Sequence, residues 1–98
     1  YAVTGPHVSI DGPVEIKPDE TCDWDGDASY GYPQTYTYIW YLDTDSIASG
    51  EELELSIKDE DGHEILLVVK DGQNVEGTAV IEVDVDSSYE SCSGGGGN

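Results

Sequence analysis

The chain has 98 residues, which is enough for one domain and too few for two. It carries 22 acidic and 3 basic residues, and its formal net charge is −19. Nucleic acids and anionic membranes attract cationic surfaces, so this composition argues against both as partners. No apolar run reaches the roughly 20 residues that a membrane-spanning helix needs, so no membrane insertion is expected.

The acidic excess also bears on the environment of the chain. Repulsion between carboxylates destabilises a compact state at low ionic strength, and molar salt screens charges beyond roughly 3 Å. Two interpretations follow: a halophilic or marine source, and a module whose carboxylates bind calcium. A surface that serves only solubility is compatible with either. Because Met is absent and no signal-peptide pattern occurs, we expect a processed product or an excised fragment.

The chain begins with short alternating segments. Residues 1–6 are a lead-in, 7–10 alternate as a first strand, and Asp11-Gly12-Pro13 predicts a turn. Residues 14–16 alternate again before Pro18, a residue that ends a strand or marks a sheet edge. We expect one split strand that passes from one sheet to the other.

A less regular, acidic segment follows, and it contains the candidate metal ligands. A strand is predicted to begin near Cys22, and the next residues are interpreted as an acidic loop around Gly26. Calcium takes roughly 6–8 oxygen ligands, and a flexible acidic loop supplies several. The candidate ligands are Asp23, Asp25 and Asp27, with a solvated loop as the alternative. A second candidate set is Asp59, Asp61 and Glu64.

Residues 36–42 give the clearest strand signal, because aromatic and β-branched side chains fill them. Large apolar side chains occupy every second position: Tyr36, Tyr38, Trp40 and Leu42. We expect this face to lie in the core, opposite a hydrophobic strand at 64–69. The other face is the predicted surface for a partner: Thr37, Ile39 and Tyr41.

Further tyrosines surround this strand and form a candidate binding surface. Exposed aromatic rings stack on sugars or anchor protein partners. The predicted binding residues are Tyr30, Tyr32 and Tyr41, with Trp24 in the same cluster. The alternative is a cluster divided between the core and cross-strand pairs.

The second half of the chain alternates more regularly. An edge piece is predicted at 46–48 and a strand at 51–57, and the apolar run at 64–69 predicts a central strand covered on both faces. Asp71-Gly72 predicts a turn. The last strand runs over 78–85 with one apolar face, and 87–98 form a Ser/Gly-rich tail.

Cys22 and Cys92 are the two cysteines of the chain. No Cys-x-x-Cys pattern occurs, and His7 and His63 lack the spacing of zinc ligands. We predict one disulfide, which implies an oxidising compartment and contributes about 4 kcal/mol in the chain-entropy model. Two free thiols or intermolecular bridges are the alternatives.

Together these elements predict an all-β chain, an antiparallel β-sandwich of about seven strands with Greek-key connections over residues 7–86. Carboxylate pairs arise by chance among so many acids, and neither His lies in a nucleophile motif. No glycine-rich phosphate loop occurs. We predict no catalytic residues and no enzymatic activity, with calcium as the one candidate cofactor.

Residues 49–72 resemble the second half of polycystic-kidney-disease-type (PKD) and related immunoglobulin-like repeats. In those families an Asp-x-Gly corner precedes a hydrophobic strand that ends in Asp-Gly, as Asp71-Gly72 ends it here. Trp40 matches the core Trp of their third strand, and the resemblance covers residues 8–86. The chain departs at the Trp-x-Phe-Gly-Asp-Gly signature, which is here Trp40-Tyr41-Leu42-Asp43-Thr44-Asp45, and at the antibody-type disulfide, which lacks its second Cys.

The resemblance implies that the predicted sandwich is immunoglobulin-like and that the chain is an extracellular or cell-surface module without catalytic activity. It predicts a spacer or an adhesion unit whose partner is a protein or a glycan. One alternative is a self-assembling subunit of an extracellular filament or virion, whose copies exchange strands. The other is a calcium-dependent carbohydrate-binding module.

Overall fold

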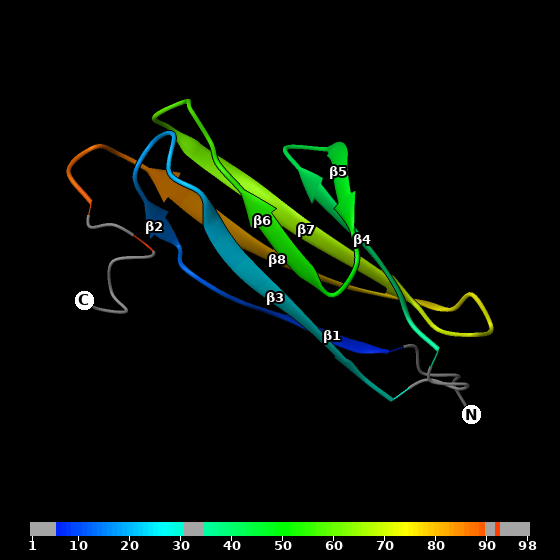
Figure 1. The fold of residues 1–98 in the computed structure, drawn as a ribbon. Helices are drawn as coiled ribbons and strands as arrows, with labels where there is room; N and C mark the ends of the chain where they lie inside the picture. Colours follow the sequence, from blue (N-terminus) through cyan, green and yellow to red (C-terminus); the bar gives the residue numbers. More distant parts are fainter. Residues whose placement is uncertain (1–5, 31–34, 90–91, 93–98) are drawn as a thin grey trace.

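Two sheets face one another in the computed structural model, which describes residues 6–30, 35–89 and 92 (Figure 1). One sheet has the strand order β1–β3–β6, and the other has the order β2–β8–β7–β4–β5. The described residues contain no helix that could cross a membrane. The strands are β1 His7–Asp11, β2 Glu15–Ile16, β3 Cys22–Ser29, β4 Thr37–Leu42, β5 Asp45–Ser49, β6 Glu52–Leu55, β7 Gly62–Lys70 and β8 Glu76–Val85.

The first strand is split between the sheets, as predicted. β1 pairs antiparallel with β3, whereas β2 pairs parallel with β8 at the edge of the larger sheet. The chain crosses between them at Gly12 and Pro13. A side chain at Gly12 would collide with the ring of Trp24, and the Pro13 carbonyl accepts the indole N–H of Trp24. The crossing therefore lies directly against a core residue.

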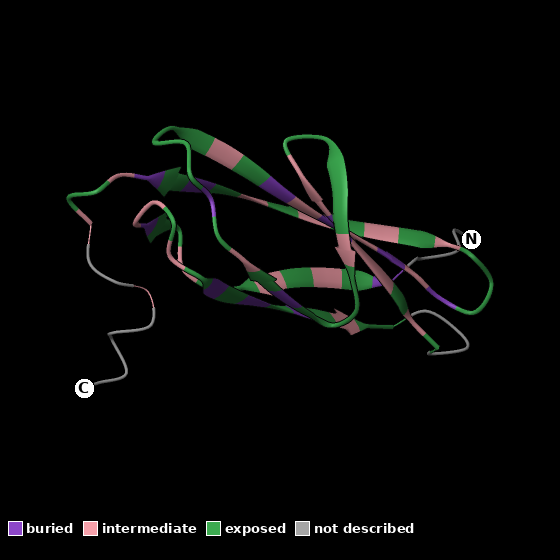
Figure 2. Ribbon diagram, turned by 45° about the horizontal axis from the view of Figure 1, so that its top comes forward, coloured by how far each residue is buried: buried purple, intermediate pink, exposed green. Residues whose placement is uncertain are grey.

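Apolar side chains at alternate strand positions form the core. Figure 2 shows buried positions alternating with more exposed ones along the strands. Trp24 and Trp40 are fully buried, and their N–H groups donate hydrogen bonds of 2.8 Å to the carbonyls of Pro13 and Gly50. Both indoles thus bury their rings without leaving a donor unpaired. The other core residues are Ile16, Cys22, Leu53, Ile57, Ile65, Leu67, Val69, Val83 and Val85. The inward face predicted for residues 36–42 is confirmed, because Tyr36, Tyr38 and Leu42 pack against this core.

Two predictions about the hydrophobic strands are wrong. β4 does not lie opposite β7 across the core but beside it in the same sheet, where Trp40 pairs with Leu67. β7 is central, between β8 and β4, yet only alternate residues such as Ile65 are buried. Leu66 and Val68 point away from the core and are only half-buried. A continuous apolar run therefore does not mean that both faces of this strand are covered.

Two aspartates define the hairpin turns of the larger sheet. Asp43 and Thr44 have φ values of 49° and 79°, which is the pattern of a two-residue type I′ turn between β4 and β5. In the β7–β8 turn, a carboxylate oxygen of the buried Asp71 accepts the N–H groups of Gln73 and Val75 at 2.8 and 3.1 Å. These side chains set the registers that place the outward residues in rows.

Cys22 and Cys92 form the predicted disulfide, with their Cα atoms 5.9 Å apart. Cys22 is buried at the start of β3, and Glu20 accepts the N–H of Cys92 at 3.0 Å. Most of the predicted tail, residues 90–91 and 93–98, lies outside the described residues. The disulfide attaches the chain near its end to the smaller sheet.

Replacing Trp40 with Ala tests this core. Because the indole is fully buried, Trp40→Ala is expected to lower the free energy of unfolding by about 3–5 kcal/mol in urea titrations. Val14→Ala, at a side chain that is 51% exposed, serves as the control and is expected to change it by less than about 0.5 kcal/mol. Equal stability of the two variants would contradict the placement of Trp40.

Candidate functional site

Six carboxylates cover the outward side of the three-stranded sheet. The predicted metal ligands Asp23, Asp25 and Asp27 lie in β3, where they alternate with buried residues and point to solvent. The interpretation of this segment as a loop is therefore wrong. Its strand pattern is weak because one of the inward positions is Gly26, where a side chain would collide with Leu67.

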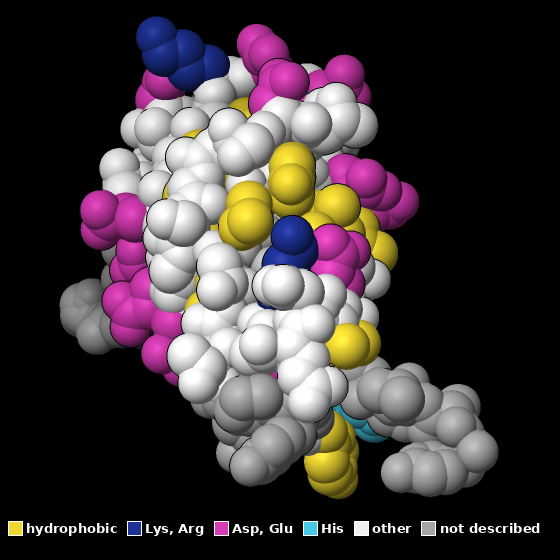
Figure 3. Space-filling view, turned by 90° about the vertical axis from the view of Figure 1, so that its right-hand side faces the viewer, with side chains coloured by type: hydrophobic (Ala, Val, Ile, Leu, Met, Phe, Trp, Pro, Cys, Tyr) yellow, Lys and Arg dark blue, Asp and Glu magenta, His cyan; other side chains and the backbone are white. Residues whose placement is uncertain are grey.

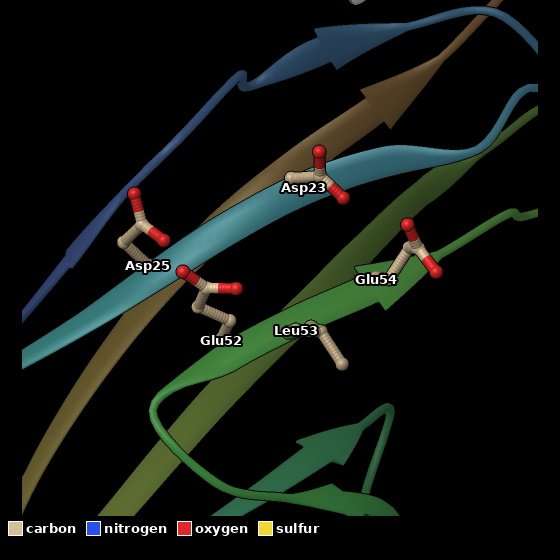
Figure 4. Close-up of a pocket in the computed structure, with 5 residues that line it drawn as sticks. All are labelled: Asp23, Asp25, Glu52, Leu53 and Glu54. Atoms are coloured by element: carbon tan, nitrogen blue, oxygen red, sulfur yellow. The ribbon is translucent and has the colours of Figure 1, made fainter.

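The registers place these acids directly opposite further acids on both sides. Asp25 lies between Asp11 of β1 and Glu52 of β6, and Glu54 lies opposite Asp23. Figure 4 shows the side chains of β3 and β6 that line an open hollow, Asp23, Asp25, Glu52, Leu53 and Glu54. We call the six residues the acidic face: Asp11, Asp23, Asp25, Asp27, Glu52 and Glu54. Like charges opposite one another destabilise a sheet, so bound cations or dissolved salt would weaken the repulsion between these carboxylates.

The predicted calcium ligands do not converge on one point. Alternate residues of a strand lie about 6.7 Å apart, whereas calcium lies about 2.3–2.6 Å from each ligand oxygen. Within the described residues, three potential ligand atoms lie within 4.8 Å of one another at Glu20, Cys22 and Cys92, whose sulfurs form the disulfide. The acidic face is thus an open array of charges, and calcium binding at Asp23, Asp25 and Asp27 stays a prediction.

Removing one charge of a facing pair tests the repulsion. Glu54→Gln is expected to raise the free energy of unfolding by about 0.5 kcal/mol in low-salt buffer, because Glu54 lies opposite Asp23. Glu60→Gln removes the same charge from an exposed position between β6 and β7, outside the two sheets. An equal rise in the free energy of unfolding in both variants would show that only net charge matters. It would contradict a specific repulsion between Glu54 and Asp23.

A second polar cluster connects the β4–β5 turn with the segment before β7. Nδ1 of His63 lies 2.6 Å from a carboxylate oxygen of Asp43, and Nε2 lies 3.0 Å from the carbonyl oxygen of Asp59. Both partners only accept, so a ring that makes both bonds donates from both nitrogens and is positively charged. The second carboxylate oxygen of Asp43 accepts the N–H of Glu64 at 2.9 Å.

This contact shifts two pKa values. Burial of the ring lowers the pKa of His63, but the hydrogen bonds to Asp43 and Asp59 outweigh it and hold the pKa above 6.5. The same hydrogen bond from His63, together with the N–H of Glu64, lowers the pKa of Asp43 below 3.8. Because both ring nitrogens are engaged, His63 is arranged as a structural cation and has no nitrogen free to act as a base.

The raised pKa predicts a pH dependence of stability. The His63 contact stabilises the folded state fully below pH 6.5, the ordinary pKa of a histidine. This stabilisation is lost as the pH rises through the higher pKa that His63 has in the folded state. The melting temperature is therefore expected to fall across this window, and His63→Gln should reduce that fall. His7→Gln is the control, since His7 lies on β1 beside Tyr30. A fall of the same size in the His63 variant would contradict the assignment.

The predicted aromatic binding residues are not gathered into one surface. Tyr30 is 62% exposed at the end of β3, beside His7, whereas Tyr41 lies in β4 of the other sheet. Tyr32 lies outside the described residues. Trp24 belongs to the core, so its placement in an exposed cluster is wrong.

The larger sheet instead carries an apolar surface that sequence reasoning found only in part. The registers align Tyr41 with Leu66 and Val80, and Ile39 with Val68. Val80 is 54% exposed. Ile47 of the edge strand β5 lies at the irregularity in the β4–β5 pairing and is 37% exposed. We call this set the apolar face: Ile39, Tyr41, Ile47, Leu66, Val68 and Val80. The missed signal is Val80, an apolar residue at an outward position of β8 between Thr78 and Glu82.

Comparison with known proteins places the fold. No family model matches the chain, and no curated protein matches it. The PKD domain of an M14-like peptidase from Thermoplasmatales archaeon SCGC AB-540-F20 is similar in structure, with a TM-score of 0.70 and 15% sequence identity. The similarity covers 86% of this chain and 98% of that chain. The chain therefore has a PKD-type, immunoglobulin-like fold, which confirms the resemblance seen in residues 8–86.

Proposed function

We propose that this chain is a non-catalytic module of a secreted or cell-surface protein, where it acts as a spacer or as an adhesion or binding unit. The observation that carries the proposal is the similarity to nearly all of a PKD domain, 98% of its length. That domain accompanies a peptidase, and the likeness concerns the domain rather than the enzyme. A function for this chain is therefore sought on its surfaces.

The arrangement of the polar residues supports a role without catalysis. His63 has both ring nitrogens in hydrogen bonds to acceptors, so it cannot take a proton from a nucleophile. The hollow at the acidic face is open and lined mostly by carboxylates of similar surroundings. A catalytic pair of carboxyl groups relies on two different environments, whereas the six carboxylates of this face are all exposed.

The disulfide supports an oxidising location. Such bonds persist outside the reducing cytosol, and this one joins the start of β3 to Cys92, 70 residues later in the chain. The net charge of −19 fits a medium rich in salt or divalent cations, which screen the acidic face. A secreted or surface-displayed module in a saline environment combines both properties.

Native mass spectrometry, unreduced and then reduced, tests the proposal. A spacer or binding module is expected as a monomer with one intramolecular disulfide, and reduction should leave the copy number unchanged. A defined oligomer would contradict it and favour the self-assembling subunit. Calcium retained by the wild type and lost on Asp25→Asn would instead favour the calcium-dependent alternative, since Asp25 lies between two other acids.

A further inference from the structure

The apolar face is the one outward surface of the sandwich that the fold does not explain. On the smaller sheet the outward residues of β3 and β6 are acidic, as expected for a face in contact with water. On the larger sheet one row is apolar across three strands, Tyr41–Leu66–Val80, and the adjacent row is apolar across two, Ile39–Val68, and ends at Thr78. Hydrophobic side chains also gather on one side of the molecule in Figure 3, next to a lysine and an acidic side chain.

These residues do not belong to the core. The half-buried side chains that pack against the core come from the inward positions, such as Tyr38, Leu42 and Ile81. None of the described strands packs over the outward side of β4, β7 and β8. Val80 is therefore exposed in the described structure, and together with its apolar neighbours it forms a contiguous candidate docking surface.

Acidic side chains border the apolar face at both ends. Glu64 and Glu82 face each other in the row after Leu66 and Val80, and Glu76 lies at the opposite end. Lys70 is the one basic residue among the described outward positions of β4, β7 and β8, and its Nζ lies 3.6 Å from Glu76. A partner that covers this face must therefore combine an apolar centre with a basic border.

Area and charge argue against a second copy of the chain as the occupant. Two rows across three strands cover roughly 200 Å², whereas a stable interface buries roughly 800 Å² on each partner. Two copies would also bring together two chains of net charge −19. One α-helix, about 10–12 Å wide with its side chains, is broad enough to cover two rows.

We propose that the apolar face binds a basic amphipathic helix of another protein. Apolar side chains of the helix cover Leu66, Val68 and Val80, and its Lys or Arg side chains reach Glu64, Glu82 and Glu76. The inference rests on the proposed role as a binding module and adds the site and the class of partner.

Three designed peptides probe the site by fluorescence anisotropy at moderate salt. The first is an amphipathic helix of Leu and Lys, the second has Ser in place of Leu, and the third has Glu in place of Lys. A chain of net charge −19 attracts any cationic peptide, so the second peptide measures that background. The Leu–Lys peptide is expected to bind at least about tenfold more tightly than either control.

A matched pair of variants locates the binding. Val80→Lys and Val14→Lys each remove an exposed valine, 54% and 51% exposed, and each adds one positive charge. Val80→Lys is expected to weaken binding at least about tenfold, and Val14→Lys less than about threefold. Glu82→Gln and Glu54→Gln form a second pair with one glutamate on each sheet, and only Glu82→Gln should weaken binding.

Four results would overturn the inference. Equal affinity for the Leu–Lys and Ser–Lys peptides would show that net charge alone explains the binding. Equal losses of affinity in Val80→Lys and Val14→Lys would show the same. Self-association that Val80→Lys abolishes would make a second copy the occupant. Circular dichroism of each variant separates loss of folding from loss of binding. A folded monomer that binds none of the peptides would contradict this inference and leave the proposed function standing.

Discussion

Repulsion among 22 acidic side chains, opposed by three lysines, is the constraint on which the rest of the structure depends. A chain of this charge folds only if most of its carboxylates reach water, and the two-residue period of a strand provides that in β3 and β6. What holds the sheets together is then a small core around Trp24 and Trp40, both with paired N–H groups. The disulfide adds a covalent attachment near the end of the chain. His63 is one of the few cations, because its ring donates to both Asp43 and Asp59. It joins the β4–β5 turn to the segment before β7.

Much of the fold could be predicted from the sequence, because large inward side chains reveal a strand directly. β4 and β8 have such side chains at every second position, and the split of the first strand follows from the turn at residues 11–13. β3 was harder to recognise, since Gly26 occupies an inward position and acids occupy the outward ones. The acidic rows could not be predicted at all. They depend on the pairing of β3 with β1 and β6, which are distant in the sequence, and on registers set by turns. The uncovered side of β7 escaped prediction because an apolar run does not say what packs on it.

The outward sides of the two sheets differ in chemical character. One sheet presents carboxylates in facing pairs, and the other presents an apolar surface between acidic borders. Among the described residues, no strand packs on the outward side of either sheet, since the core lies between the two sheets. In the proposed function, the acidic face contacts the solvent and the apolar face holds the proposed helix. This division follows from the same alternation that keeps the acids out of the core.

The central claim is that charge repulsion opposes this fold and that the medium relieves it. The most direct test is the free energy of unfolding of the wild type, measured with urea at NaCl concentrations from low to molar. Urea is uncharged, so the ionic strength varies independently of the denaturant. We expect the free energy of unfolding to rise with salt and to level off once screening reaches the spacing of the acidic rows. A value that stays constant or falls with salt would contradict the account.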